Sequence, residues 1–170
     1  IMDVQDRVID IELTNRCNAL CSFCPRSETP EQGFMTFDTF KQVIARVSEL
    51  DVLPWITLTG QGESTLHPQL VEFVAYAKDH GARVRMTTNG NRLDADMAQA
   101  LLEAGLAGID FSVSDMGDDY QLVYNLDFEQ TRRNIIHFVQ LAREADPDFV
   151  IRLSIVRHDL NRGKEKEMID

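Results

Sequence analysis

Three cysteines lie close together near the start of the chain, in the stretch ELTNRCNALCSFCPR (12–26). Cys17, Cys21 and Cys24 fall within eight residues, and no other cysteine occurs among the 170 residues. Clustered thiolates are ligands of zinc and of iron–sulfur clusters, whereas an odd number of cysteines in one loop is a poor disulfide framework. The spacing therefore indicates that these thiols serve a metal or catalysis in a reducing compartment.

The number of thiols separates the candidate metal sites. Structural zinc sites use four protein ligands, commonly from paired Cys and His motifs, and none of His67, His80, His137 and His158 lies at such a spacing from the cysteines. A cubane cluster held by three cysteines leaves one iron without a protein ligand, and that iron can bind a substrate or cofactor directly. A zinc site and a plain electron-transfer cluster remain the alternatives.

The composition limits the classes of protein and partner. The chain has 44% hydrophobic residues, which suffices for one ordinary globular core. Its formal net charge of −11 argues against nucleic acid as a partner, because binding phosphates requires clustered Lys and Arg. No apolar run approaches the roughly 20 residues of a membrane span, and the start of the chain lacks a signal-peptide pattern. We therefore expect a cytoplasmic protein with no membrane partner.

Segments typical of strands and helices alternate along almost the whole chain. The expected strands are 7–14, 54–60, 82–90, 107–114 and 149–156. The expected helices are 34–50 with Thr36 as its N-cap, 68–81 opened by Pro68, 94–105 with Asp94 as its N-cap, and 127–145, and residues 163–170 resemble the start of another. This alternation predicts an α/β fold with a parallel sheet. Because the chain stops within it, we expect a fragment of a longer protein.

Each expected strand is apolar on one face and polar on the other. The apolar faces carry Ile9, Ile11, Leu13, Ile56, Leu58, Val84, Met86, Ile109, Phe111, Val113, Ile151, Leu153 and Ile155. The polar faces carry Asp10, Glu12, Thr14, Thr57, Thr59, Arg83, Arg85, Thr87, Asp110, Ser112, Ser114, Arg152 and Ser154. A doubly wound sheet is apolar on both faces, so the pattern favours a barrel or open half-barrel with helices outside and a polar lumen. A two-layer sandwich with its polar face in water is the alternative.

The polar faces also carry opposite charges. In a closed lumen, carboxylates on the first strand are expected to offset the charges of Arg85 and Arg152, since a buried charge requires a partner. This pairing favours the barrel over the sandwich.

The spacing CxxxCxxC directly after a first strand, with Phe23 between the second and third cysteines, resembles the radical S-adenosylmethionine (SAM) superfamily. The resemblance extends over residues 8 to about 156. It implies a partial (βα)6 TIM-like barrel with five strands present and the sixth missing, so that residues 1–170 form a radical SAM core domain. It also implies that the three cysteines bind three irons of a 4Fe-4S cluster, while the amino and carboxylate groups of SAM chelate the fourth.

The segment TGQGES (59–64), after the second expected strand, resembles the glycine-rich GGEP-type motif of this superfamily. The resemblance implies that Gly60 and Gly62 let the backbone approach SAM closely. It also implies that Glu63 binds the methionine ammonium. Ser64 stands where the family commonly has Pro, a departure that leaves the glutamate intact.

Two further motifs fall at family positions. TTNG (87–90) resembles an element after the third strand, which places Thr88 and Asn89 at the site, although Asn-Gly is equally a good turn. Ser112 matches the usual ribose-contacting position. Many relatives have Asp two residues later, where this chain has Ser114 followed by Asp115, so the acid is expected to be displaced by one position.

Arg152 and Ser154 lie on the polar face of the fifth strand, where relatives often hold the cofactor's carboxylate or ribose. An ion pair between Arg152 and Glu12 in the lumen is the alternative. Other conspicuous residues are expected to have structural roles: a loop position for His67, solvated loop positions for Asp118, Asp119 and Tyr120, and packing for Trp55.

The chemistry implied by the resemblance is reductive. A reduced cluster passes one electron to SAM, the C5′–S bond breaks, and a 5′-deoxyadenosyl radical abstracts hydrogen from a substrate. The electron is expected from an external donor of the flavodoxin or ferredoxin type, because the chain contains no second cysteine cluster. The motifs most resemble the branch with a SPASM or twitch extension, whose members act on peptides, proteins or sugar-derived metabolites. The alternative is an iron–sulfur or zinc electron-transfer module that never cleaves SAM.

Overall fold

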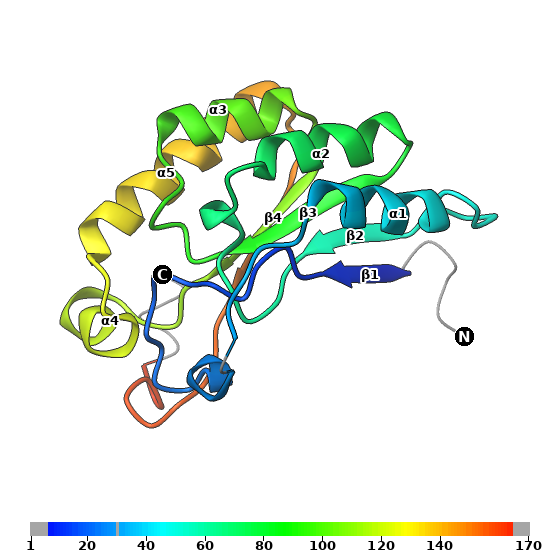
Figure 1. Ribbon diagram of the computed structural model, residues 1–170. Coiled ribbons are helices and arrows are strands. Elements are labelled where there is room, and N and C mark those ends of the chain that lie inside the picture. Colours follow the sequence, from blue (N-terminus) through cyan, green and yellow to red (C-terminus); the bar gives the residue numbers. More distant parts are fainter. Residues whose placement is uncertain (1–6, 30, 165–170) are drawn as a thin grey trace.

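Five parallel strands form one sheet in the computed structural model, which describes residues 7–29 and 31–164 (Figure 1). The strands are β1 (Val8–Ile11), β2 (Trp55–Leu58), β3 (Arg83–Thr88), β4 (Gly108–Ser112) and β5 (Val150–Ser154). Their order in the sheet is β1-β2-β3-β4-β5, so each strand pairs in parallel with the next one in sequence. Parallel neighbours need crossover connections, and the intervening helices provide them. The α/β prediction of a partial TIM-like barrel is confirmed.

Helices cover one side of this sheet. The helices of the chain are α1 (Phe37–Val47), α2 (Leu70–Asp79), α3 (Ala95–Glu103), α4 (Gly117–Tyr124) and α5 (Phe128–Ala145), and the short 3-10 helices are η2 (Pro25–Glu28) and η3 (Ser64–Leu66). Figure 1 shows α1, α2, α3 and α5 on the same side. Thr36 and Asp94 cap α1 and α3 as predicted, since each side chain accepts a backbone N–H three residues on. Pro68 precedes α2 by two positions instead of opening it.

Two further sequence predictions concern a helix at residues 163–170 and the lack of a membrane-spanning segment. The helix predicted for 163–170 falls almost wholly outside the described residues. Within the described ranges, no helix has the length and apolar character needed to cross a membrane.

The apolar face of the sheet is buried under the helices, as its alternation predicts. Its fully buried side chains include Ile56, Leu58, Val84, Met86 and Ile109. The end of β5 is an exception, because Leu153 is 52% exposed and Ile155 is 36% exposed. The expectation that helices cover these two residues is wrong. The preceding helix, α5, packs through Phe138 against Phe111 of β4.

The prediction that the residues after β4 form a solvated loop is also wrong. They form α4, with Asp118 and Asp119 in the first turn, where carboxylates interact favourably with the helix dipole. Tyr120, Val123 and Tyr124 are buried, and the rings of the two tyrosines stack with their centroids 4.5 Å apart. Their i, i+3, i+4 spacing is a helix signal, but it is weak in a segment of eight residues that has no side-chain N-cap.

The polar face carries an ion-pair network centred on β4. Arg85 Nε lies 3.8 Å from Asp110 Oδ2, and Arg152 Nε lies 3.9 Å from Asp110 Oδ1. Arg85 Nε also donates a hydrogen bond to Thr57 Oγ1 at 2.9 Å. The expectation that first-strand carboxylates such as Glu12 pair with these arginines is therefore wrong. In the sheet β1 pairs with β2, whereas β4 pairs with both β3 and β5, which carry the two arginines.

Candidate functional site

The cysteine loop follows β1 and lies at the carboxyl end of the sheet, where barrels of this kind place their sites. Cys17, Cys21 and Cys24 are free and half-buried. They line one cavity of about 270 Å³. Six of the predicted cofactor residues line the same cavity: Phe23, Gly60, Gly62, Glu63, Asn89 and Ser112. The structure thus brings together residues from the loops after β1, β2 and β3 and from the end of β4.

Two of the thiols lie in surroundings that favour their protonated form when no metal is bound. Burial raises the pKa of Cys17 and raises the pKa of Cys21 to about 12. The backbone N–H of Ala19 donates to Cys17 Sγ at 3.4 Å, and Cys24 N–H donates to the carbonyl oxygen of Cys21 at 3.1 Å. Binding of a metal at these thiols therefore displaces protons.

The three thiols also fit a cluster better than a single ion. Within the described ranges, no three His, Cys, Asp or Glu side chains converge as ligands of one metal ion do. A 4Fe-4S cluster requires a different arrangement, because each thiolate binds its own iron atom. Three free thiols on one cavity wall supply that donor set.

The glycine-rich turn after β2 packs directly against the backbone that leads into the cysteine loop. A Cβ atom on Gly62 would lie 1.9 Å from the carbonyl oxygen of Thr14, so only glycine fits there. The next residue, Glu63, donates its backbone N–H to the carbonyl oxygen of Arg16 at 2.8 Å. A Cβ on Gly60 would lie 2.3 Å from Glu12 Oε1. Gly62 is therefore required for close packing between two loops, whatever ligand it approaches, whereas the contact at Gly60 is with a side chain that can move.

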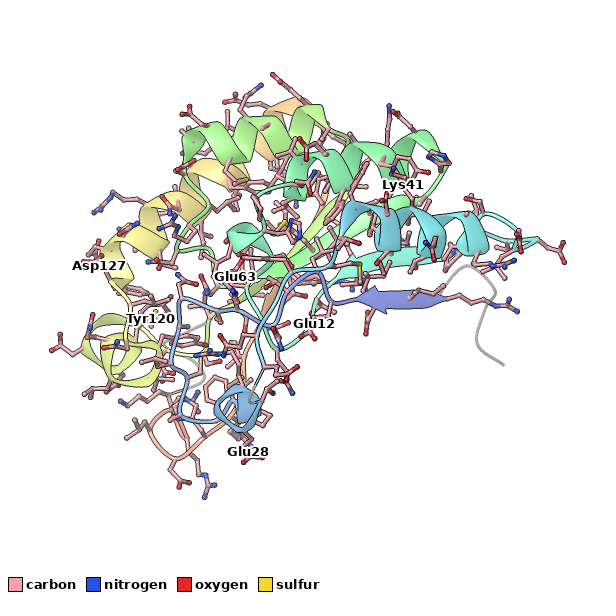
Figure 2. All side chains as sticks on the ribbon, viewed as in Figure 1. Glu12, Glu28, Lys41, Glu63, Tyr120 and Asp127 are labelled. Atoms are coloured by element: carbon pink, nitrogen blue, oxygen red, sulfur yellow. The ribbon has the colours of Figure 1, made fainter. Side chains whose placement is uncertain are left out.

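Glu63, labelled in Figure 2, is buried in the interior. Its carboxylate accepts four hydrogen bonds. Oε1 accepts from the backbone N–H of Thr65 at 3.0 Å and from the hydroxyls of Thr65 and Thr88, both at 2.8 Å. Oε2 accepts from the backbone N–H of Asn89 at 2.8 Å. A carboxylate oxygen has about two acceptor positions, so Oε2 retains room for one further donor. Glu63 thus connects the turn after β2 to the turn after β3.

Asparagines extend this network to the cysteine loop. The side chain of Asn89 donates to Asn18 Oδ1 at 2.9 Å, and Asn18 Nδ2 donates to Asn91 Oδ1 at 3.1 Å. Asn91 Nδ2 in turn donates to the hydroxyl of Thr131 on α5 at 3.1 Å. Because Asn18 directly follows Cys17, this series of hydrogen bonds positions the first cysteine. The sequence analysis missed Asn18 and Asn91, whose only signal is a polar amide beside each motif.

Ser112, Arg152 and Ser154 are placed differently from one another. Ser112 lines the cavity, whereas Arg152 and Ser154 do not. Ser154 pairs in register with Ser112 across β4 and β5. Arg152 belongs to the ion-pair network with Asp110, and its side chain is 55% exposed. Of the three, the structure brings only Ser112 to the cavity that the cysteines line.

The second half of the cysteine loop contacts residues that the sequence analysis did not assign to the site. Tyr124 of α4 lines the cavity, and the ring of Phe23 lies edge-on to it with centroids 6.0 Å apart. The face of Phe23 also packs against the imidazole of His158 at 5.6 Å. Asp115, the acid displaced by one position, is buried and bonds to His158 at 2.8 Å instead of lining the cavity.

His67 and Trp55, which are predicted to have structural roles, contact other protein groups and do not line the cavity. His67 is buried, its Nε2 lies 3.0 Å from the carbonyl oxygen of Met35, and its Nδ1 accepts the backbone N–H of Gln69. Burial lowers the pKa of this imidazole below its usual 6.5. Trp55 packs under the guanidinium of Arg83, which lies 4.0 Å from the indole centroid.

This chain matches only part of the length of each of two described relatives. The chain is 32% identical over 104 residues to the tungsten-containing aldehyde ferredoxin oxidoreductase cofactor-modifying protein of Pyrococcus furiosus, over 61% of this chain and 29% of that protein. It is 29% identical over 160 residues to the AdoMet-dependent heme synthase of Methanosarcina barkeri, over 91% of this chain and 44% of that protein. The chain thus spans less than half the length of either relative.

Solved structures share the fold. BtrN in complex with AdoMet (SAM) and 2-DOIA superposes with a TM-score of 0.62 at 25% identity, over 89% of this chain and 58% of that one. SuiB of Streptococcus suis bound to the precursor peptide SuiA superposes with a TM-score of 0.74 at 14% identity, over 98% of this chain and 36% of that one. The family model of the radical SAM superfamily matches residues 11–169. The chain therefore belongs to the radical SAM superfamily, whose cofactors are a 4Fe-4S cluster and SAM.

Proposed function

We propose that this chain forms the core of an enzyme that reductively cleaves SAM and uses the radical so formed to abstract hydrogen from a substrate. One observation carries the proposal: the three cysteines line the same cavity as the glycine-rich turn, Asn89 and Ser112. When bound, the cluster and SAM supply the electron transfer and the 5′-deoxyadenosyl radical. The protein supplies ligation, orientation and exclusion of water.

Each predicted site residue has a proposed task. The thiolates of Cys17, Cys21 and Cys24 each hold one iron. Glu63 Oε2, with one acceptor position unused by the protein, accepts a hydrogen bond from the methionine ammonium. Ser112 contacts the ribose.

The remaining candidates lie around these groups. Gly60 and Gly62 provide backbone at the cavity wall, and Asn89 and Phe23 shape it. Arg152 and Ser154 face the same side of the sheet from β5, in register with Asp110 and Ser112. We propose that Arg152 and Ser154 contact the carboxylate or the ribose of the cofactor.

The partners follow from the same chemistry. Because the chain has a single cysteine cluster, we propose an external one-electron donor of the flavodoxin or ferredoxin type. We propose a peptide, a protein or a small sugar-derived metabolite as the substrate. Two structural neighbours support this range, since one was solved with 2-DOIA and the other with a precursor peptide. We also propose the SPASM or twitch branch, with residues 1–170 as one core domain.

Anaerobic reconstitution tests the proposed function. The chain is loaded with iron and sulfide, reduced with dithionite and incubated with SAM, and 5′-deoxyadenosine is measured by mass spectrometry. We expect product from the parent chain and none from Cys21→Ser, which lacks one iron ligand. Cluster loading without 5′-deoxyadenosine would contradict the proposal and favour an electron-transfer module.

A further inference from the structure

The cysteine loop is held in two halves by different parts of the fold. Its first half is bound to the turns after β2 and β3: Arg16 accepts the backbone N–H of Glu63, and Asn18 bonds to the side chains of Asn89 and Asn91. Between β1 and α1, the only regular structure in the described residues is the short 3-10 helix η2. The second half of the loop is therefore held by tertiary contacts with other parts of the fold.

Those contacts come from α4 and from the segment after β5. The backbone N–H of Leu20 donates to the carbonyl oxygen of Tyr124 at 3.0 Å. Phe23, which lies between Cys21 and Cys24 in sequence, packs edge-on against Tyr124 and at an interplanar angle of 31° against His158. The imidazole of His158 thus supports the aromatic residue that separates two metal ligands.

Hydrogen bonds occupy both ring nitrogens of His158. Nε2 lies 2.8 Å from Asp115 Oδ2, and Nδ1 accepts the backbone N–H of Leu160 at 3.4 Å. Because Nδ1 is the acceptor for Leu160, Nε2 is the ring nitrogen that donates to the Asp115 carboxylate. The side chain of Asp115 is only 1% exposed and that of His158 is 14% exposed. Since neither nitrogen is left for a substrate, the ring faces are the part of His158 that remains for contact.

The segment that carries His158 is itself fixed to the end of β4. Asn161 Nδ2 donates to the carbonyl oxygens of Ser114 at 2.9 Å and Val156 at 2.8 Å. Asn161 Oδ1 accepts the backbone N–H of His158 at 2.9 Å. The chain after β4 and the chain after β5 are thereby joined in one hydrogen-bonded unit, which holds the imidazole rigidly against Phe23.

We propose that the Asp115–His158 pair is a positioning element for the cluster, which fixes the Cys21–Cys24 half of the loop and keeps water from the metal site. This inference rests on the proposed function, in which the three cysteines hold the cluster. Solvent exposure is one of the properties that set the reduction potential of iron–sulfur clusters. The pair therefore influences both how long the cluster survives and how readily it accepts an electron.

Three variants test this role. His158→Ala removes the ring, and His158→Phe keeps a ring but cannot bond to Asp115. His80→Ala is the matched control, because His80 also packs on an aromatic ring, Tyr76, at 4.1 Å and bonds to its carbonyl oxygen, but does so on α2. Hydrogen exchange on the metal-free chain reports loop opening directly. Iron loss to a chelator and an EPR-monitored redox titration report on the loaded chain.

We expect amides of residues 20–24 to exchange about tenfold faster in His158→Ala, since Phe23 then loses the ring on which it packs. Iron should be lost about tenfold faster and the midpoint potential should rise, with His158→Phe between this variant and the parent. His80→Ala should match the parent. Unchanged exchange in β2 and β3 establishes that the variants are folded.

The outcomes separate this inference from the proposed function. A parent chain that takes up no cluster contradicts the proposed function, and the exchange measurement then still tests the loop contact. Exchange, iron loss and potential in folded His158→Ala that all match the parent would overturn the positioning role.

Discussion

The buried carboxylate of Glu63 is the most connected polar group of the site, so its replacement by an amide is the sharpest perturbation available. In Glu63→Gln one carboxylate oxygen becomes an NH2 group. If the NH2 group replaces Oε2, it faces the backbone N–H of Asn89, which is itself a donor. If it replaces Oε1, it faces the backbone N–H of Thr65 and two hydroxyls. Either orientation leaves a buried backbone donor without an acceptor.

The expected loss of stability follows from these contacts. A hydrogen bond to a charged group contributes roughly 1.5–3 kcal/mol, and a buried donor left unsatisfied costs about 1–3 kcal/mol. Some of this cost is relieved because the hydroxyls of Thr65 and Thr88 can rotate. We therefore expect Glu63→Gln to lower the free energy of unfolding by about 3 kcal/mol. For a domain of this size that corresponds to a melting temperature roughly 6–12 °C lower.

Thermal and urea unfolding of the metal-free chain measure this effect. Glu12→Gln is the matched control, because the exposed carboxylate of Glu12 accepts a single bond from the backbone N–H of Gln61 at 2.6 Å. An amide oxygen can still accept that bond, so the control should lose less than about 0.5 kcal/mol. A Glu63→Gln chain that melts within one or two degrees of the parent would refute the reasoning from the four hydrogen bonds.

The same variant tests the proposed contact with SAM. If Glu63 Oε2 also accepts the methionine ammonium, the loaded variant should bind SAM about ten- to a hundredfold more weakly with unchanged cluster content. Titration of SAM into the reduced cluster, followed by EPR, measures the affinity. Unaltered affinity would leave Glu63 with its structural role alone.

Three further predictions follow from the site. Alanine at any one of the three cysteines should abolish the oxygen-sensitive 4Fe-4S cluster, which iron analysis and Mössbauer spectroscopy detect, whereas stoichiometric zinc in the parent would contradict it. Gly62→Ala should cost at least about 3 kcal/mol by urea unfolding, because its Cβ overlaps the carbonyl oxygen of Thr14; Gly33→Ala, with no atom within 4 Å, is the control. His67 has a lowered pKa, so its contribution to stability is present above pH 6.5 and is lost as pH falls toward the folded pKa. Unfolding of His67→Gln should show a weaker dependence on pH in that window, and an identical pH profile would contradict the assignment.

Local patterns in the sequence were sufficient to predict the fold class and most of the residues that gather at one cavity. Strand alternation, the capping residues Thr36 and Asp94, and the cysteine spacing depend on residues close together in the chain, and the structure confirms the parallel sheet and both caps. Six of the eight predicted cofactor residues reach the cavity because the carboxyl ends of parallel strands meet at one edge of a sheet.

The identity of each polar partner required the tertiary structure. Asp110, and not a carboxylate of β1, pairs with Arg152, because strand order determines which side chains are neighbours. Asp115 and His158 are 43 positions apart and meet only because β4 and β5 are adjacent. The type of a residue determines which bonds its side chain can make. Whether that side chain meets a ligand or another side chain depends on contacts between distant segments, and these contacts exist only once the sheet has formed.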